Sequence, residues 1–78
     1  MARLRLFASI REAAGTGSDT FPGTTVGEVL DAASARYGAT FTALLGTCKV
    51  WCNGEPADND HPVADDDEVA VLPPVSGG

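Results

Sequence analysis

The stretch TVGEVLDAASARYG, residues 25–38, is the clearest structural signal in this 78-residue chain. Its apolar residues recur at the spacing of one helical face, namely Val26, Val29, Leu30, Ala33 and Tyr37. Thr25 is a good helix N-cap, Glu28 completes a capping box three residues later, and glycine at position 38 is a typical C-terminal cap. The sequence therefore predicts one amphipathic helix over residues 26–37.

Short stretches of strand character lie on both sides of this helix. They cover residues 3–7, 18–21, 49–53 and 68–72, which alternate polar and apolar residues or end at Pro-Gly or Asn-Gly turn signals. Residues 9–14 are typical of a short helical turn closed by a glycine, residues 40–45 of a short helical or irregular connection, and residues 56–62 of a polar loop. This order of elements predicts an α+β fold, with one main helix packed on one face of a mixed sheet.

Size and charge restrict the function further. A chain of 78 residues forms one small domain. Eleven acidic against five basic residues give a net charge of −6, which disfavours nucleic acid as a partner and favours a basic partner surface. No apolar run approaches the ~20 residues of a membrane span, and the apolar stretch near the start ends at Arg11 and Glu12. We therefore expect a cytoplasmic protein that binds no membrane.

The cysteines do not indicate a disulfide or a metal site. If Cys48 and Cys52 share one extended strand, they are roughly 13 Å apart, whereas a disulfide tolerates a Cα separation of about 7 Å at most. Their Cys-x3-Cys spacing is not that of a zinc site, and no second ligand pair exists. We interpret both as small buried apolar residues in a reducing compartment, with a reactive role as the alternative.

No catalytic constellation is visible either. His61 is the only histidine and lies in a polar loop, where a solvated side chain is favoured over a ligand or a base. Asp58 and Asp60 begin like a calcium-binding EF-hand loop, but Val63 replaces the required glycine and Val69 the required glutamate. The sequence therefore predicts no metal site and no stand-alone catalytic residue.

The last six residues differ from the rest of the chain. Pro73, Pro74, Val75, Ser76, Gly77 and Gly78 follow the final strand. Two prolines cannot continue a sheet ladder, and glycines without side chains fit a narrow channel. Six extended residues reach up to ~20 Å. We expect a domain over residues 1–72 and an extended tail over 73–78 that delivers a terminal carboxylate into another protein's active site; a frayed end is the alternative.

These features together resemble a known family. The resemblance is carried by Leu6-Phe7-Ala8 with Arg11-Glu12 and Gly15, by Asn53-Gly54, and by residues 60–78, above all Asp67-Glu68-Val69 and the PPVSGG tail. The chain is similar to the ubiquitin-like β-grasp proteins and, among them, to the molybdopterin synthase small subunit of the MoaD/ThiS family of sulfur carriers. The resemblance implies a mixed sheet of four to five strands with one main helix on one face and a flexible extended C-terminal tail.

The resemblance also implies a carrier cycle, in which the chain binds no cofactor itself. A ubiquitin-activating-like adenylyltransferase would use ATP to adenylate Gly78, and a persulfide sulfur donor would convert it to a thiocarboxylate. The tail, residues 73–78, would then enter the active site of the molybdopterin synthase large subunit in a heterotetramer. There it would donate sulfur to cyclic pyranopterin monophosphate, in molybdenum cofactor biosynthesis. Phe7 and Leu72 match positions of an apolar docking surface; ordinary core packing is their alternative.

Three other functions stay open at this point. A sister carrier would serve thiamine thiazole, cysteine or transfer RNA thiolation. A ubiquitin-like protein modifier would be joined through Gly78 to lysines of its targets. A plain interaction module would have an inert tail.

Overall fold

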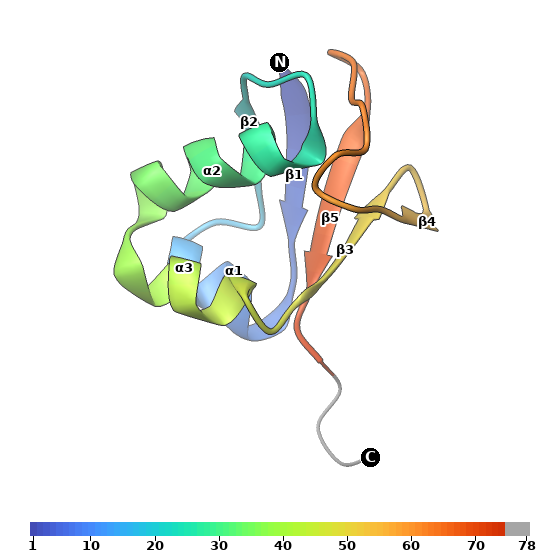
Figure 1. Cartoon of the computed structure of the whole chain (residues 1–78). Coiled ribbons are helices and arrows are strands. Elements are labelled where there is room, and N and C mark those ends of the chain that lie inside the picture. Colours follow the sequence, from blue (N-terminus) through green and yellow to red (C-terminus); the bar gives the residue numbers. More distant parts are fainter. Residues whose placement is uncertain (75–78) are drawn as a thin grey trace.

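The computed structural model describes residues 1–74 as a five-stranded sheet and three helices (Figure 1). In chain order the elements are β1 (Ala2–Leu6), α1 (Ala8–Ala14), β2 (Ser18–Phe21), α2 (Val26–Tyr37), α3 (Ala39–Leu45), β3 (Lys49–Cys52), β4 (Glu55–Pro56) and β5 (Glu68–Leu72). The strands are ordered β2-β1-β5-β3-β4. The central pair, β1 and β5, is parallel, and the other pairs are antiparallel. The predicted α+β fold with a mixed sheet is confirmed.

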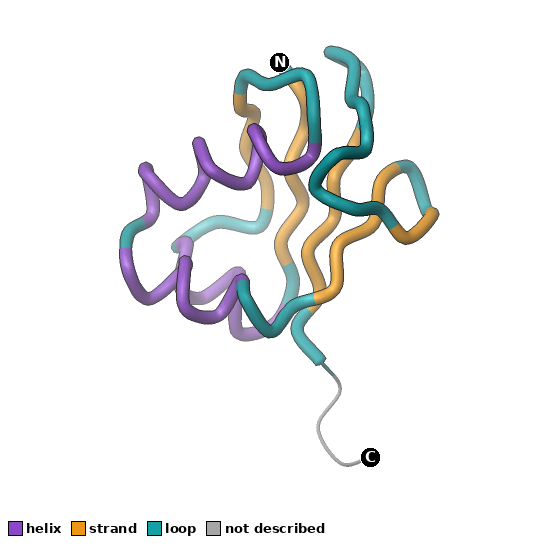
Figure 2. Tube along the Cα trace, viewed as in Figure 1, coloured by secondary structure: helices purple, strands orange, loops and turns teal. Residues whose placement is uncertain are grey.

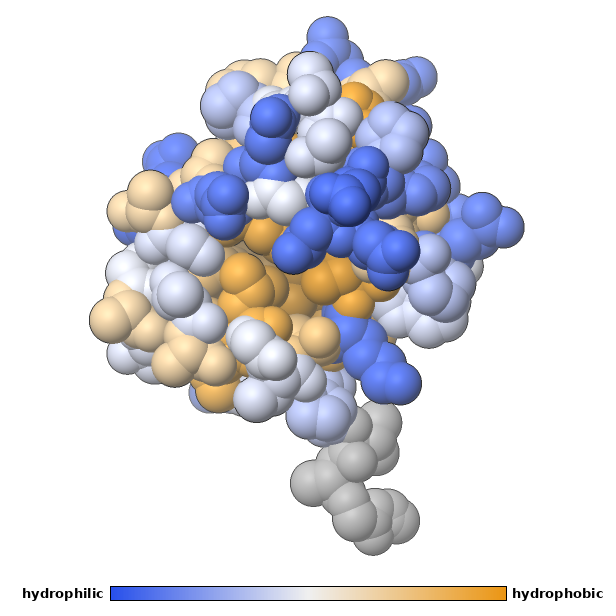
Figure 3. All heavy atoms as spheres, in the orientation of Figure 1, coloured by the Kyte–Doolittle hydropathy of each residue, from blue (hydrophilic) through white to orange (hydrophobic). Residues whose placement is uncertain are grey.

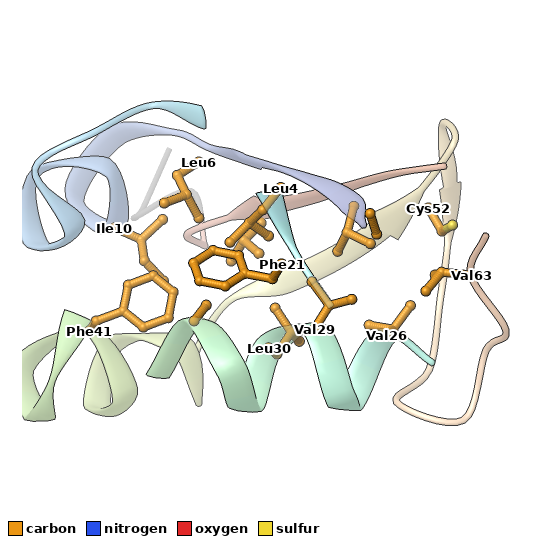
Figure 4. Close-up of a cluster of buried hydrophobic side chains, with 14 residues drawn as sticks. Leu4, Leu6, Ile10, Phe21, Val26, Val29, Leu30, Phe41, Cys52 and Val63 are labelled. Atoms are coloured by element: carbon orange, nitrogen blue, oxygen red, sulfur yellow. The ribbon is translucent and has the colours of Figure 1, made fainter. Parts of the chain in front are cut away.

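The helices cover one face of the sheet (Figure 2). Alternate strand residues point toward them, including Leu4 and Leu6 of β1 and Val71 of β5, and all three are buried. Figure 4 shows Leu4 and Leu6 on the same side of the sheet as Ile10 from α1 and Phe41 from α3, which are also fully buried. Val71 belongs to the same core cluster. Each buried side chain of this size contributes roughly 1.5–3 kcal/mol of transfer free energy. The other face of the sheet carries no helix within residues 1–74.

Several elements refine or differ from their predicted form or bounds. Pro56, predicted as the start of a polar loop, belongs to the short strand β4, which pairs with β3 across the Asn53-Gly54 turn. The connection predicted as short helical or irregular is helical: it is α3, whose Phe41 is fully buried in the core. Helix α1 starts one residue earlier than predicted, at Ala8. Strand β1 starts and ends one residue earlier than predicted, and β3 ends one residue earlier, at Cys52. A two-residue strand has no periodicity to detect, and the core that orders α3 involves residues far away in the sequence.

The N-terminus of α2 is held by a cap and by a distant loop. The Glu28 amide donates to the Thr25 hydroxyl oxygen at 3.2 Å, as the predicted capping box requires. The Glu28 carboxylate accepts the Thr24 amide at 2.7 Å. The first two amides of the helix donate to this distant loop: the Val26 amide to the His61 carbonyl and the Gly27 amide to the Asn59 carbonyl, each at 2.9 Å. The connection between β4 and β5 thus satisfies donors that would otherwise be unpaired.

None of the helices in residues 1–74 has both the length and the apolar character needed to cross a lipid bilayer. The longest, α2, has 12 residues.

Candidate functional site

The central strand β5 leads directly into the predicted tail. Its last residue, Leu72, is opposite Lys49 of β3, and Val71 is opposite Leu6 at the end of β1. Both neighbouring strands therefore run beside β5 up to the point where the chain leaves the sheet (Figure 1). Pro73 is half-buried and Pro74 is exposed. The prolines have no amide hydrogen with which to extend the ladder.

The rest of the predicted tail, namely Val75, Ser76, Gly77 and Gly78, lies outside the described residues. The attachment role of Gly78 and the insertion of residues 73–78 into a partner stay predictions.

The strand registers define one open face of the sheet. Arg3 and Arg5 of β1 are opposite Thr20 and Ser18 of β2, and their side chains point away from the buried residues Leu4 and Leu6. Residues directly opposite one another in a sheet share a face. The open face therefore consists of Arg3, Arg5, Ser18, Thr20, Lys49, Trp51, Pro56, Glu68, Ala70 and Leu72.

An apolar corner lies on this face where the tail leaves. Phe7 and Leu72 are 39% and 37% exposed, so neither belongs to the core. A shallow hollow of about 480 Å³ is lined by Lys49, Trp51, Leu72, Pro73 and Pro74. We call these five residues the tail-exit hollow. An exposed apolar area beside a proline-rich exit is suited to contact with another protein. Partner docking by Phe7 and Leu72 stays a prediction.

The backbone at the end of β1 places Phe7 on this face. Phe7 has extended φ and ψ of −132° and 152°, and Ala8 then takes a positive φ of 54°. A left-handed alanine costs roughly 1–2 kcal/mol. This sharp change of direction carries α1 to the helix-covered face. The guanidinium carbon of Arg5 lies 5.7 Å from the centroid of the Phe7 ring, within the range of a cation–π contact.

The two cysteines are free and lie on the helix-covered side of the molecule. Cys52 is buried in the core and Cys48 is half-buried. Burial raises the pKa of both thiols, which keeps them protonated at neutral pH. The Cys48 thiol donates to the Leu44 carbonyl at 3.2 Å. These surroundings match the interpretation of small buried apolar residues and oppose a thiolate nucleophile.

The polar residues His61 and Asp67 take part in bonds that hold the fold together. His61 is exposed, and its carbonyl accepts the amide of Val26 at the start of α2. Asp67 accepts the Ala64 amide at 2.8 Å and the Asn53 side-chain amide at 3.0 Å, and these bonds lower its pKa. Within residues 1–74, no three metal-ligating side chains gather into a possible ion site.

Several residues of the open face were not predicted from the sequence. Arg3, Arg5, Lys49 and Trp51 were not assigned to any surface, although the alternation of residues 3–7 places both arginines opposite the core. Lys49 and Trp51 join them only through the pairing of β3 with β5. Strand pairing between distant segments leaves no local pattern in a sequence.

Comparisons with protein families, with known sequences and with solved structures all find related small proteins. The model of the ThiS family matches residues 4–78. The chain is 36% identical over 84 aligned positions to small archaeal modifier protein 1 of Haloferax volcanii, covering 95% of this chain and 97% of that protein. The solution structure of small archaeal modifier protein 1 from Methanosarcina acetivorans is 30% identical, with a TM-score of 0.87 and coverage of 99% and 95%.

A third relative is found in a complex. It belongs to the protein–protein complex of subunits 1 and 2 of molybdopterin-converting factor from Helicobacter pylori. It is 26% identical, with a TM-score of 0.72 and coverage of 99% of this chain and 97% of that one. The family match, the coverage of the relatives and the structural similarity agree with the resemblance inferred from the sequence. The chain therefore belongs to the ThiS family of ubiquitin-like sulfur carriers and modifiers, with the β-grasp fold.

Proposed function

We propose that this chain is a sulfur carrier whose terminal Gly78 is adenylated and then thiocarboxylated. The observation that carries the proposal is the passage from the central strand β5 into the Pro73-Pro74 exit, followed by residues that the family match includes up to position 78. The described chain leaves the sheet at Pro73 and reaches an exposed Pro74, outside the buried core. A slim glycine end suits a narrow active-site channel in a partner.

The chemistry needs activation because a carboxylate is a poor acyl donor. In the first step a carboxylate oxygen of Gly78 attacks the α-phosphorus of ATP, and pyrophosphate leaves. The terminal sulfur of a persulfide then attacks the acyl carbon, and AMP leaves with the bonding electron pair. A second thiol cleaves the resulting acyl disulfide, which gives the thiocarboxylate and a new disulfide. The adenylating enzyme supplies ATP chemistry, and this chain supplies the acyl group. A reducing cytoplasm fits the persulfide and thiocarboxylate.

The sulfur acceptor that we propose is cyclic pyranopterin monophosphate. The relative from Helicobacter pylori that supports this acceptor is found with subunit 2 of molybdopterin-converting factor. By analogy, the tail of this chain, residues 73–78, would enter the large subunit of molybdopterin synthase. Phe7 and Leu72 would dock against that subunit at the base of the tail.

A second candidate is conjugation to lysines of other proteins. The observation in its favour is the 36% identity to small archaeal modifier protein 1, against 26% to the molybdopterin-converting factor subunit. Both functions use the same activated Gly78. They differ in the nucleophile that receives it, which is sulfur in the carrier and a lysine amine in the modifier.

Intact-mass spectrometry tests the common step. The chain is incubated with ATP, the adenylating enzyme from the same organism and a persulfide donor. We expect the mass increase of one oxygen-to-sulfur exchange, located on Gly78 by fragmentation. A chain that lacks Gly78 is the control and should stay unchanged. An unchanged mass for the full chain would contradict the carrier function.

The acceptor is tested separately. The thiocarboxylated chain is mixed with the molybdopterin synthase large subunit and cyclic pyranopterin monophosphate. Formation of the dithiolene, with return of the chain to its carboxylate mass, supports the first candidate. Isopeptide-linked remnants of this chain on lysines of host proteins, without dithiolene formation, support the modifier.

A further inference from the structure

The outer strand β2 pairs with another strand on one side only. It stands at the end of the order β2-β1-β5-β3-β4, so β1 is its single partner among residues 1–74 (Figure 1). An unpaired edge presents N–H and C=O groups that can bond a strand of another molecule. The opposite edge, β4, has two residues, one of which is Pro56 and has no amide hydrogen. In the described sheet, β2 is therefore the edge at which a second molecule could add a strand.

The register shows which backbone groups of β2 point outward. The Leu6 amide donates to the Gly17 carbonyl at 2.9 Å, in the pair that precedes Ser18 in the ladder. Hydrogen-bonded and non-hydrogen-bonded pairs alternate along an antiparallel ladder. The N–H and C=O groups of Asp19 therefore face β1, whereas those of Ser18 and Thr20 point away from the sheet.

Nearby side chains occupy these outward groups. The Thr16 hydroxyl donates to the Ser18 carbonyl at 3.0 Å and accepts the Ser18 amide at 3.4 Å. The Thr20 amide donates to Oδ1 of Asp19 at 2.8 Å. Three of the four outward groups of Ser18 and Thr20 are thus bonded within the chain. Pro22, directly after β2, has no amide hydrogen to offer. The edge is closed by side chains of its own chain.

Helix α2 holds the Asp19 carboxylate in this position. While Oδ1 accepts the Thr20 amide, Oδ2 accepts the Tyr37 hydroxyl at 2.7 Å and lies 3.8 Å from Nε of Arg36. The Arg36 guanidinium in turn lies over the ring of Phe21, 5.9 Å from its centroid. Both carboxylate oxygens are engaged, so Asp19 cannot rotate away from the edge without losing its bond to Tyr37.

The charge of Asp19 is a second obstacle to strand addition. Two copies of β2 that pair antiparallel are related by a two-fold axis. If Ser18 of one copy is opposite Thr20 of the other, the two Asp19 residues are directly opposite each other. Cβ atoms of such a pair are about 4.5–5.5 Å apart, and like charges there are destabilising. Asp19 therefore opposes this pairing by repulsion as well as by occupying the Thr20 amide.

We propose that Asp19, positioned by Tyr37, is an edge-blocking residue that prevents β2 of one copy from pairing with β2 of a second copy. A second copy is the molecule excluded, because two identical antiparallel edges present outward groups that match each other across the two-fold axis. The proposal concerns the oligomeric state of the chain and does not depend on activation of Gly78.

Matched charge variants test the proposal. Asp19→Ala removes the blocking carboxylate, and Asp31→Ala removes the same charge from an exposed position of α2. Sedimentation equilibrium up to about 1 mM protein measures the Kd of self-association. We expect wild type and Asp31→Ala to be monomers. Asp19→Ala should self-associate at least about tenfold more tightly than wild type, because it frees one amide per copy and removes the repulsion.

Two conservative variants separate the hydrogen bond from the charge. Asp19→Asn keeps an oxygen for the Thr20 amide but is neutral, so it should associate less than Asp19→Ala. Tyr37→Phe keeps the ring but loses the hydroxyl that positions the carboxylate, so association should lie between wild type and Asp19→Ala. Thermal unfolding checks the fold of each variant. If Asp19→Ala is unfolded, Tyr37→Phe decides: association above wild type supports the proposal and a monomer overturns it.

A further variant locates the contact. Figure 3 shows hydrophobic residues at the surface of the helix-covered side, where Leu30, Leu45 and Val50 line a hollow of about 390 Å³. Association through that area would not involve the edge. Thr20→Pro, added to Asp19→Ala, removes the outward amide, and proline is tolerated at an edge position whose N–H faces solvent. We expect the double variant to be a monomer.

Four results would overturn the proposal. These are a monomeric Asp19→Ala variant that is folded, a wild-type dimer, equal association of Asp19→Ala and Asp31→Ala, and association of the double variant as tight as that of Asp19→Ala. Equal association of Asp19→Asn and Asp19→Ala would overturn the role of the amide bond. Thiocarboxylation of Gly78, measured on the same variants, is a separate result, so the proposed function can hold or fail independently.

Discussion

Tyr37, the only tyrosine in the chain, joins α2 to the edge strand β2. Its hydroxyl donates to a carboxylate oxygen of Asp19 at 2.7 Å. Its ring meets that of Phe21 edge to face, with centroids 5.7 Å apart, and that of Phe41 at 5.0 Å. Burial, and then the hydrogen bond to Asp19, raise the pKa of Tyr37 from 10.0 to about 12. The same hydrogen bond lowers the pKa of Asp19.

This pair predicts an alkaline transition. Because the folded pKa of Tyr37 is raised, its contribution to stability is fully present below pH 10 and is lost as the pH rises through about 12. Tyrosinate absorbance should therefore appear well above pH 10, and Asp19→Asn should shift its midpoint downward. Circular dichroism at each pH shows whether the chain is still folded. A midpoint near pH 10 in the folded wild-type chain would contradict this account.

Asn53 stabilises the fold in two ways, through its backbone conformation and through its side-chain hydrogen bonds. It has a φ of 51° in the turn between β3 and β4. Its side-chain amide donates to Asp67 at 3.0 Å, and its side-chain oxygen accepts the Glu68 amide at 3.0 Å. The turn is thereby fastened to the start of β5. Asparagine tolerates this backbone conformation better than most residues do.

Substitutions separate these two roles of Asn53. We expect Asn53→Ala to lower the free energy of unfolding by about 1–2 kcal/mol, because it loses two hydrogen bonds and strains the backbone. Asn53→Gly loses the bonds but relieves the backbone, so it should cost less. Urea unfolding of the two variants measures the difference. Equal stability of Asn53→Ala and wild type would show that the turn does not depend on this side chain.

At the scale of elements, α2 depends on a local cap and on a distant loop. Thr25→Ala removes the hydroxyl oxygen that accepts the Glu28 amide, and caps of this type contribute about 1 kcal/mol. Thr40→Ala is the matched control, since Thr40 is an exposed threonine in α3. We expect a lower unfolding midpoint in urea for the first variant only. Similar midpoints for both variants would mean that the Asn59 and His61 carbonyls suffice to hold the helix start.

At the scale of the whole molecule, the core and the tail are separate. The buried residues lie between positions 2 and 71 of the described chain, and Pro73 and Pro74 lie outside them. Deletion of Gly78 should therefore leave the unfolding midpoint within error of wild type while abolishing sulfur loading. Urea unfolding and intact mass, measured on the same preparation, check both parts. Loss of the fold in the shortened chain would contradict a purely functional role for this residue.

The main elements of the fold follow from local sequence patterns. The helical spacing and capping residues of 25–38 predict α2 with its observed bounds, and the Asn53-Gly54 turn has positive φ at both residues. Strands β2 and β5 have their predicted bounds as well. These features are determined within a few residues of chain, since helix periodicity, caps and turn conformations are local. The family resemblance added the β-grasp arrangement that local patterns cannot supply.

Which charges share a surface depends on how the chain folds. The sequence gives a net charge of −6 and an alternation along β1 that keeps Arg3 and Arg5 out of the core. It did not bring Arg11 against Gly17, or Lys49 beside Leu72, because these positions depend on a helix connection and on pairing of β3 with β5. Total charge is a sum over residues, whereas a binding surface depends on where folding places each of them. The presence of Arg3, Arg5 and Lys49 on one open face is therefore a property of the folded sheet.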